Sequence, residues 1–218
     1  MTRSGIEVCI VAYDKQLNKL LESWVDTVKR YTSMFEDNPW WYNERATLST
    51  LAGAAWSLDG WIALEEYSTV KKSRSTKTVI DSGALKKGRC DLYISNNDCG
   101  FAIEAKQVWQ SLDTEDNLIK KGMQLAWDDV ARLKENDCRY LAATFIVPFL
   151  KLSEASLPPD DLEPRLLSWL KNCSDFRRNP QAQTSYAYLF PDLGSPYFSN
   201  RTHHYPGVVL VLEEKNLG

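Results

Sequence analysis

Apolar residues recur every three to four positions in several segments of the chain, and this spacing predicts amphipathic helices. The first helix is expected over residues 16–35, the second over about 41–58 and the third over 114–135. Asp37-Asn38-Pro39 separates the first two helices, because a proline cannot continue a helix from its interior. A shorter helix is expected at about 163–172, after a pair of prolines.

Strands are predicted where apolar residues alternate with polar ones or run together. Residues 6–11 and 61–70 are short mixed segments that contain β-branched residues. Residues 140–149 and 208–212 are almost continuously apolar, which is typical of strands covered on both faces. The segment 175–206 contains four prolines and many aromatic residues, so we expect it to be irregular.

Two neighbouring segments predict strands that carry charged residues. In GFAIEAK (residues 100–106), Glu104 and Lys106 lie on one pleat face and the apolar residues on the other. In GRCDLYI (residues 88–94), Asp91 points away from the face shared by Cys90, Leu92 and Ile94. The linker between them is rich in turn-forming residues, which predicts an antiparallel hairpin. This hairpin would place Asp91 near Glu104 and Lys106.

The expected order is two helices, three strands, a crossover helix, a strand, a helix and a final strand. This order predicts an α/β fold with a mixed central β-sheet flanked by helices. We expect one domain over residues 1–218. It would consist of an N-terminal helical extension (1–40), a core (41–147), an insertion (150–205) and a closing strand (206–218).

Composition indicates a soluble globular chain: 44% of the residues are hydrophobic and 25% are charged. No run of about 18 apolar residues is present, so no membrane partner or span is expected. The N-terminus does not resemble a signal peptide, since Glu7 interrupts its first apolar residues. Five scattered cysteines without a CxxC pair favour free thiols, and a reducing cytoplasm is the expected location.

A net charge of −3 conceals one strongly basic segment. Residues 71–89 have a net charge of +6, because seven cations are opposed by Asp81 alone. Such a segment on an acidic body can guide a polyanion to one place, although a solvated hairpin tip has the same composition. The candidate nucleic-acid-binding residues are Lys71, Lys72, Arg74, Lys77, Lys86, Lys87 and Arg89.

The element order, with Asp91 followed by Glu104-Ala105-Lys106 on the next strand, resembles the PD-(D/E)XK nuclease superfamily. The resemblance covers roughly residues 41–147 and implies a restriction-endonuclease-like αβββαβ core. Cys90 stands where the namesake proline would be. Family members often carry a further acid on the preceding helix, and Glu44 is the matching residue in this chain.

The resemblance implies a Mg²⁺-dependent endonuclease that hydrolyses phosphodiester bonds, with DNA expected as the substrate in preference to RNA. Asp91, Glu104 and the carbonyl of Ala105 would bind Mg²⁺, with Mn²⁺ as a substitute, because Mg²⁺ prefers hard oxygen ligands. Lys106 would position or polarise the attacking water, and Glu44 would orient a second water or ion. A homodimer is compatible with the family but does not follow from the sequence.

Several alternatives stay open. Gln107 and Gln124 are accessory candidates, and the ordinary presence of polar residues on a protein surface explains them equally well. Glu65 or Glu66 could take the place of Glu44, since strict alternation turns one of these two side chains inward. Asp91 and Lys106 could instead form a structural ion pair across the strands. A second E-x-K tripeptide, Glu213-Glu214-Lys215, is assigned no chemistry.

Other chemistries find less support in the sequence. The two histidines, His203 and His204, are adjacent in an expected loop and have no nearby third ligand, which argues against zinc. No phosphate-binding glycine motif occurs. The tryptophan pair Trp40-Trp41 and the later aromatic residues are expected to pack in the core. The alternative functions are a catalytically silent nuclease-like module that binds nucleic acid or protein, or an effector that needs a partner or a small-molecule trigger.

Overall fold

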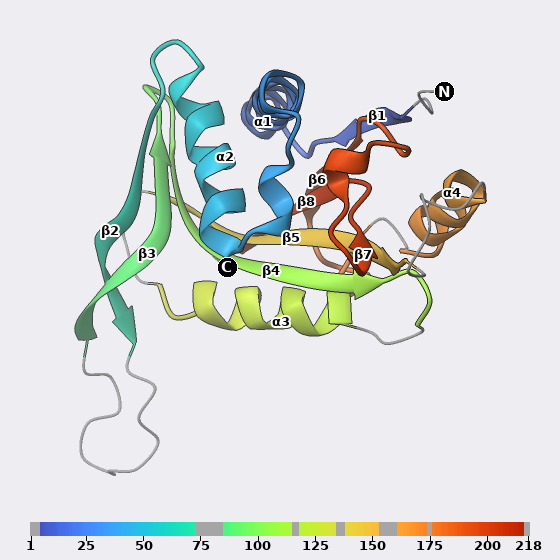
Figure 1. The fold of residues 1–218 in the computed structure, drawn as a ribbon. Coiled ribbons are helices and arrows are strands. Elements are labelled where there is room, and N and C mark those ends of the chain that lie inside the picture. The colour runs from blue at the N-terminus through green and yellow to red at the C-terminus, as the bar shows by residue number, and fades with distance from the viewer. Residues whose placement is uncertain are drawn as a thin grey trace.

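The computed structural model describes residues 5–72, 85–114, 118–133, 138–152, 161–173 and 176–215. Within these residues the chain forms a mixed eight-stranded sheet flanked by helices, as the sequence predicts (Figure 1). The strands are β1 (Ile6–Val11), β2 (Ile62–Lys72), β3 (Leu85–Ser95), β4 (Gly100–Ser111), β5 (Arg139–Lys151), β6 (Thr184–Phe190), β7 (His203–His204) and β8 (Val208–Lys215). The α-helices are α1 (Lys15–Phe35), α2 (Glu44–Trp56), α3 (Leu118–Val130) and α4 (Leu162–Asn172).

The strand order is β1-β6-β8-β5-β4-β3-β2, and β7 pairs with β5. The β3–β4 hairpin is antiparallel, with Ser95 opposite Gly100, and α3 connects β4 to the parallel strand β5. Both connections were predicted. The segment from α2 through β5 therefore has the order α, β, β, β, α, β. No described helix is both long and apolar enough to cross a membrane.

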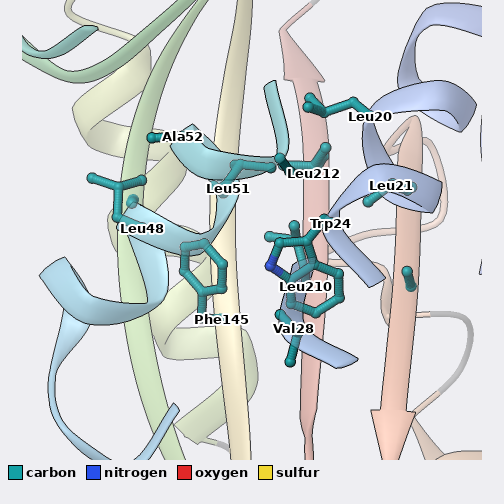
Figure 2. Close-up of a cluster of buried hydrophobic side chains, with 14 of the residues drawn as sticks. Leu20, Leu21, Trp24, Val28, Leu48, Leu51, Ala52, Phe145, Leu210 and Leu212 are labelled. Carbon is teal, nitrogen blue, oxygen red and sulfur yellow. The ribbon is translucent and has the colours of Figure 1, made fainter. Parts of the chain in front are cut away.

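Helices α1 and α2 cover one face of the sheet and α3 covers the other (Figure 1). Figure 2 shows the first interface, in which side chains of both helices meet the β5 and β8 side chains Phe145, Leu210 and Leu212. Trp24 of α1 is 1% exposed, and its indole nitrogen donates a hydrogen bond of 2.9 Å to Thr50 of α2. On the opposite face, α3 lies so close to β4 that a Cβ at Gly122 would be 2.1 Å from the Val108 side chain.

Local capping explains where α1 begins and ends. The Asp14 side chain accepts hydrogen bonds from the backbone of Gln16 and Leu17, which satisfies two amides of the first turn. Glu36 ends the helix in a left-handed conformation (φ 51°). Asn38 then caps the short 3₁₀ helix η1 (Pro39–Trp41), which fills the predicted break before α2.

The expectation that 175–206 is irregular was wrong, because Thr184–Phe190 forms the strand β6 between β1 and β8. A second 3₁₀ helix, η3, spans Pro196–Phe198, and the histidine pair forms β7 instead of a loop. The expected packing role of Trp40 is confirmed. Its side chain is fully buried against Phe198, with a ring-centroid distance of 5.2 Å. None of the five cysteines, all of which lie among the described residues, forms a disulfide.

Candidate active site

Strands β3 and β4 part at Asp91. Their pairing runs from Ser95↔Gly100 to Leu92↔Ile103. At the next position the acceptor is a side chain and not a backbone carbonyl of β3: the Asp91 carboxylate accepts a hydrogen bond of 2.8 Å from the backbone amide of Ala105. This contact holds the Asp91 carboxylate at the edge of β4, beside the Glu104-Ala105 peptide.

The side-chain alternation of β3 also breaks at Asp91. Leu92 and Ile94 share a face, as predicted, and pack under α1 and α2, but Cys90 packs with α3 on the opposite face. The prediction that all three share a face was therefore wrong. The neighbouring strand is irregular at the same place: the register passes from Glu65↔Leu92 to Tyr67↔Cys90, and Glu66 between them has a left-handed backbone (φ 52°).

The same distortion removes the two alternative acids from the site. Glu65 and Glu66 are both exposed, so the prediction that one faces inward was wrong. Both instead contact α2: Ser49 donates to Glu65 at 3.0 Å, and Arg45 binds Glu66 at 2.7 Å.

Glu104 is the most enclosed carboxylate of the candidate site, with 3% of the side chain exposed. Its Oε1 atom lies 2.5 Å from Nζ of Lys71 on β2, in a close ion pair. Burial raises the pKa of Glu104 to about 7; Lys71 opposes this rise, whereas the charges of Asp91 and Asp129 add to it. An ionised carboxylate can accept about four hydrogen bonds, so with Lys71 as its counter-charge Glu104 retains acceptor capacity in a buried position.

Lys106 points toward α3, where it meets Asp129. Its Nζ lies 3.0 Å from Oδ2 of Asp129 and donates a hydrogen bond of 2.7 Å to the carbonyl of Ala105. Burial opposes the positive charge, but the hydrogen bond to Asp129 and the charges of Asp129, Glu44 and Asp91 outweigh it and raise the pKa of Lys106.

Asp129 is a site residue that the sequence reasoning missed. It follows Gly122 by seven positions and Ala126 by three, so helical spacing places it beside the buried face of α3. An acid in that position is a signal that could have identified it. It also forms an ion pair with Arg132.

Glu44 is the first residue of α2 and contacts the same edge of β4 as Asp91. Its Oε2 accepts a hydrogen bond of 3.1 Å from the backbone amide of Gln107. The amides of Ala105 and Gln107 are two residues apart and point to one edge of the strand, so Asp91 and Glu44 bind neighbouring positions about 7 Å apart. The structure thus gathers four predicted residues, Glu44, Asp91, Glu104 and Lys106, around the Ala105 peptide.

The two glutamines have structural partners. The Gln107 side chain accepts from Thr47 at 3.0 Å and donates to the carbonyl of Trp40 at 2.9 Å, which ties α2 and η1 to β4. Gln124 is exposed on α3, where it donates to Asp128 and accepts from Arg178.

The basic segment is described in part. Lys71 reaches Glu104, and the exposed Arg89 lies 3.6 Å from Glu66. The backbones of Lys72, Lys86 and Lys87 belong to the β2–β3 ribbon. Arg74 and Lys77 lie outside the described residues.

The oxygen atoms of this cluster are of the kind that a hard cation binds, but they supply only part of its coordination shell. Asp91 and Glu104 with the Ala105 carbonyl offer hard oxygen donors, and Glu104 is a buried carboxylate with spare acceptor capacity. Among the described residues, no three carboxylate, thiol or imidazole side chains are grouped closely enough to hold an ion by themselves. Mg²⁺ commonly retains several waters, so two carboxylates and a carbonyl are a sufficient protein contribution.

Comparison with known proteins adds no relative: no family model, no curated protein and no solved structure matches this chain.

Proposed function

We propose that this chain is a metal-dependent nuclease that hydrolyses phosphodiester bonds, with DNA as the first substrate to test. The observation that carries the proposal is the convergence of Glu44, Asp91, Glu104 and Lys106 on one peptide of β4. These groups come from α2, β3 and β4, so their meeting is a property of the fold and not of a local sequence motif.

Each residue has a definable role in such a reaction. Asp91, Glu104 and the Ala105 carbonyl would hold Mg²⁺, which neutralises phosphate oxygens and acidifies water when bound. The ammonium group of Lys106 would stabilise the negative charge that develops on the phosphate, and Asp129 keeps this lysine protonated and in place. Glu44 would orient a water at the neighbouring position.

The β2–β3 ribbon supplies a route for the substrate. Lys71 lies on this ribbon and reaches the site itself, while Arg89 is exposed further along it. Phosphates that approach the ribbon would meet positive charge before they meet the carboxylates, which favours binding of a polyanion.

A second candidate function is a nucleic-acid-binding or protein-interaction module without catalysis. The ion pairs between Lys71 and Glu104 and between Lys106 and Asp129 favour it, because they let the cluster neutralise its own charges. A purely structural network of this kind needs no cation.

A cleavage assay separates the two. Purified protein is incubated with plasmid, linear duplex and single-stranded DNA and with RNA, in Mg²⁺, Mn²⁺ or EDTA. We expect metal-dependent cleavage that falls by at least about 100-fold in Asp91→Asn, Glu104→Gln and Lys106→Met.

The matched control is Glu213→Gln, which alters a carboxylate of similar burial in the other E-x-K tripeptide. Glu213 is bound by Arg178 at 2.7 Å and lies two strands from Glu104, so this variant tests the loss of a buried charge that the proposed mechanism does not use. Absence of cleavage by the wild-type chain on every substrate, with binding retained, would favour the second function. Equal activity in Glu104→Gln and wild type would refute the nuclease proposal.

A further inference from the structure

Two ammonium groups contact the oxygen atoms that we propose as cation ligands. Nζ of Lys71 lies 2.5 Å from Oε1 of Glu104, and Nζ of Lys106 lies 2.7 Å from the carbonyl oxygen of Ala105. A dication at these oxygens would bring the same charge as the two lysines together. The structure therefore shows the cluster in a self-neutralised form, in which the lysines and a cation compete for the same atoms.

The two lysines differ in what else holds them. Lys106 has a second anion, because Oδ2 of Asp129 lies 3.0 Å from its Nζ, and this ion pair does not involve the carbonyl of Ala105. Lys71 is bound by Glu104, and 21% of the lysine side chain is exposed, compared with 3% of the glutamate side chain. Lys71 is therefore the lysine that can leave its oxygen for the solvent side.

The backbone of Lys71 is anchored beside the site. It forms an isolated β-bridge with Leu133, just after α3, and belongs to the paired part of the β2–β3 ribbon. The stem of the side chain passes over Gly88 of β3, where a Cβ would lie 2.8 Å from Cγ of Lys71. The missing side chain at Gly88 thus leaves the space through which Lys71 reaches Glu104.

The ribbon that anchors Lys71 is also the part of the sheet that a polyanion can approach. The pairing of β3 with β4 ends at Leu92, whereas its pairing with β2 continues to Leu85, so this end of the ribbon projects from the sheet (Figure 1). Arg89 is exposed on the same ribbon. A phosphate bound there would offer Lys71 a second anion in place of Glu104.

We propose that Lys71 couples the binding of nucleic acid to the binding of the cation. In the free protein its ammonium group neutralises Glu104 and competes with the cation. In the complex a phosphate takes over the ammonium group, and Glu104 becomes available to the cation. The inference rests on the nuclease proposal and adds the regulation of that site. Because such coupling is reciprocal, the cation and the nucleic acid strengthen each other's binding by the same factor.

Isothermal titration calorimetry with Mg²⁺ alone tests the competition, at about pH 8.5, above the pKa of about 7 of Glu104 in the wild type. Lys71→Met removes the competitor, so the full chain carrying it should bind Mg²⁺ at least about 10-fold more tightly than wild type. Lys71→Arg keeps the charge but grips the carboxylate through a planar fork, so it should bind Mg²⁺ at least about 10-fold more weakly.

The opposite effects of these two variants separate occupation of the site from a change in overall charge. A general field effect would leave Lys71→Arg equal to wild type, since both side chains carry one positive charge. The matched control is Arg45→Gln, which removes an exposed cation of α2 that pairs with Glu66, and it should bind Mg²⁺ like wild type.

Fluorescence anisotropy with a short labelled DNA duplex in EDTA tests the phosphate half without a cation. Glu104→Gln releases Lys71 from its carboxylate and should bind the duplex at least about 10-fold more tightly than wild type. The same substitution in a chain that carries Lys71→Met changes only the overall charge, and it should gain less than about threefold. This double-mutant cycle isolates the contact between the two residues.

The inference and the nuclease proposal fail in different ways. Equal Mg²⁺ affinities of wild type, Lys71→Met and Lys71→Arg would overturn the inference and leave the cation site in place. An equal gain in DNA affinity from Glu104→Gln with and without Lys71→Met would also overturn it. Absence of Mg²⁺ binding by every chain at about 10 mM would refute the cation site itself, and with it both proposals.

Discussion

Replacing Glu104 by glutamine is expected to stabilise the metal-free protein at alkaline pH and to have little effect at acidic pH. The pKa of Glu104 rises from 4.5 to about 7 on folding, chiefly through burial. Between these values the folded protein binds more protons than the unfolded chain, so wild-type stability falls as the pH rises. The contribution of the protonated carboxyl is complete below pH 4.5 and is lost as the pH rises through about 7.

The size of the effect follows from the same values. A shift from 4.5 to about 7 corresponds to about 3 kcal/mol of unfolding free energy. Solvent screening reduces this figure little, because the side chain is 3% exposed. Glutamine resembles the protonated carboxyl and cannot ionise. The unfolding free energy of the variant should therefore be similar to that of wild type at pH 4.5 and about 3 kcal/mol higher than that of wild type at pH 9.

Urea unfolding at a series of pH values in EDTA measures this difference. Glu213→Gln is the comparison, and it should destabilise the protein at neutral pH because it leaves the partly buried Arg178 without its carboxylate. Parallel stability curves for wild type and Glu104→Gln across the whole pH range would falsify the electrostatic account of Glu104. Added Mg²⁺ should then stabilise wild type at pH 8 and leave Glu104→Gln unchanged, which tests the cation site without any cleavage.

Three further changes test other parts of the structure. Asp129→Asn should lower the pKa of Lys106 and move the alkaline limb of the cleavage pH profile to lower pH, whereas an unchanged profile would separate Asp129 from the site. Gly122→Ala should cost about 1–3 kcal/mol in urea unfolding, and Val108→Ala in the same chain should recover part of it, since the two groups compete for one space. Leu51→Ala should cost about 2–5 kcal/mol, because this fully buried side chain packs between α2 and the sheet; a loss below 1 kcal/mol would contradict that packing (Figure 2).

The parts of the fold that the sequence predicts well depend on local patterns. The β3–β4 hairpin follows from alternation on both sides of a polar turn, and Asn96 indeed accepts hydrogen bonds from the backbone of Asp98 and Cys99. Burial of β5 on both faces follows from its continuous apolar sequence. The crossover through α3 then follows from the connection rule for parallel strands.

The parts that could not be predicted depend on partners distant in sequence. Strand β6 forms among prolines because β1 and β8 pair with it on both sides. The reversal at Cys90 coincides with a left-handed Glu66 on the neighbouring strand, which no local pattern of β3 reveals. Lys71 was predicted as a phosphate ligand, and its pairing with Glu104 depends on how the β2–β3 ribbon lies against β4.

The two E-x-K tripeptides have the same motif but different counter-charges. The cation that binds each glutamate therefore distinguishes the candidate site better than the motif does. Glu104 and Glu213 lie in one row of the sheet, on either side of Ala142, and both are almost fully buried. Arg178 binds Glu213 through several nitrogen–oxygen contacts and also lies 4.3 Å over the Trp127 ring, so this carboxylate has a firmly positioned counter-charge.

Among the described residues, Glu104 instead pairs with Lys71, on a ribbon that also carries other cations. A lysine is a point charge on a flexible chain, whereas the planar guanidinium of arginine can hold both oxygens of a carboxylate. A phosphate could draw Lys71 away from Glu104, whereas the forked contact of Arg178 holds Glu213 in place. The carboxylate whose counter-charge can be exchanged is the one suited to accept a cation, and this supports assigning the chemistry to the first tripeptide.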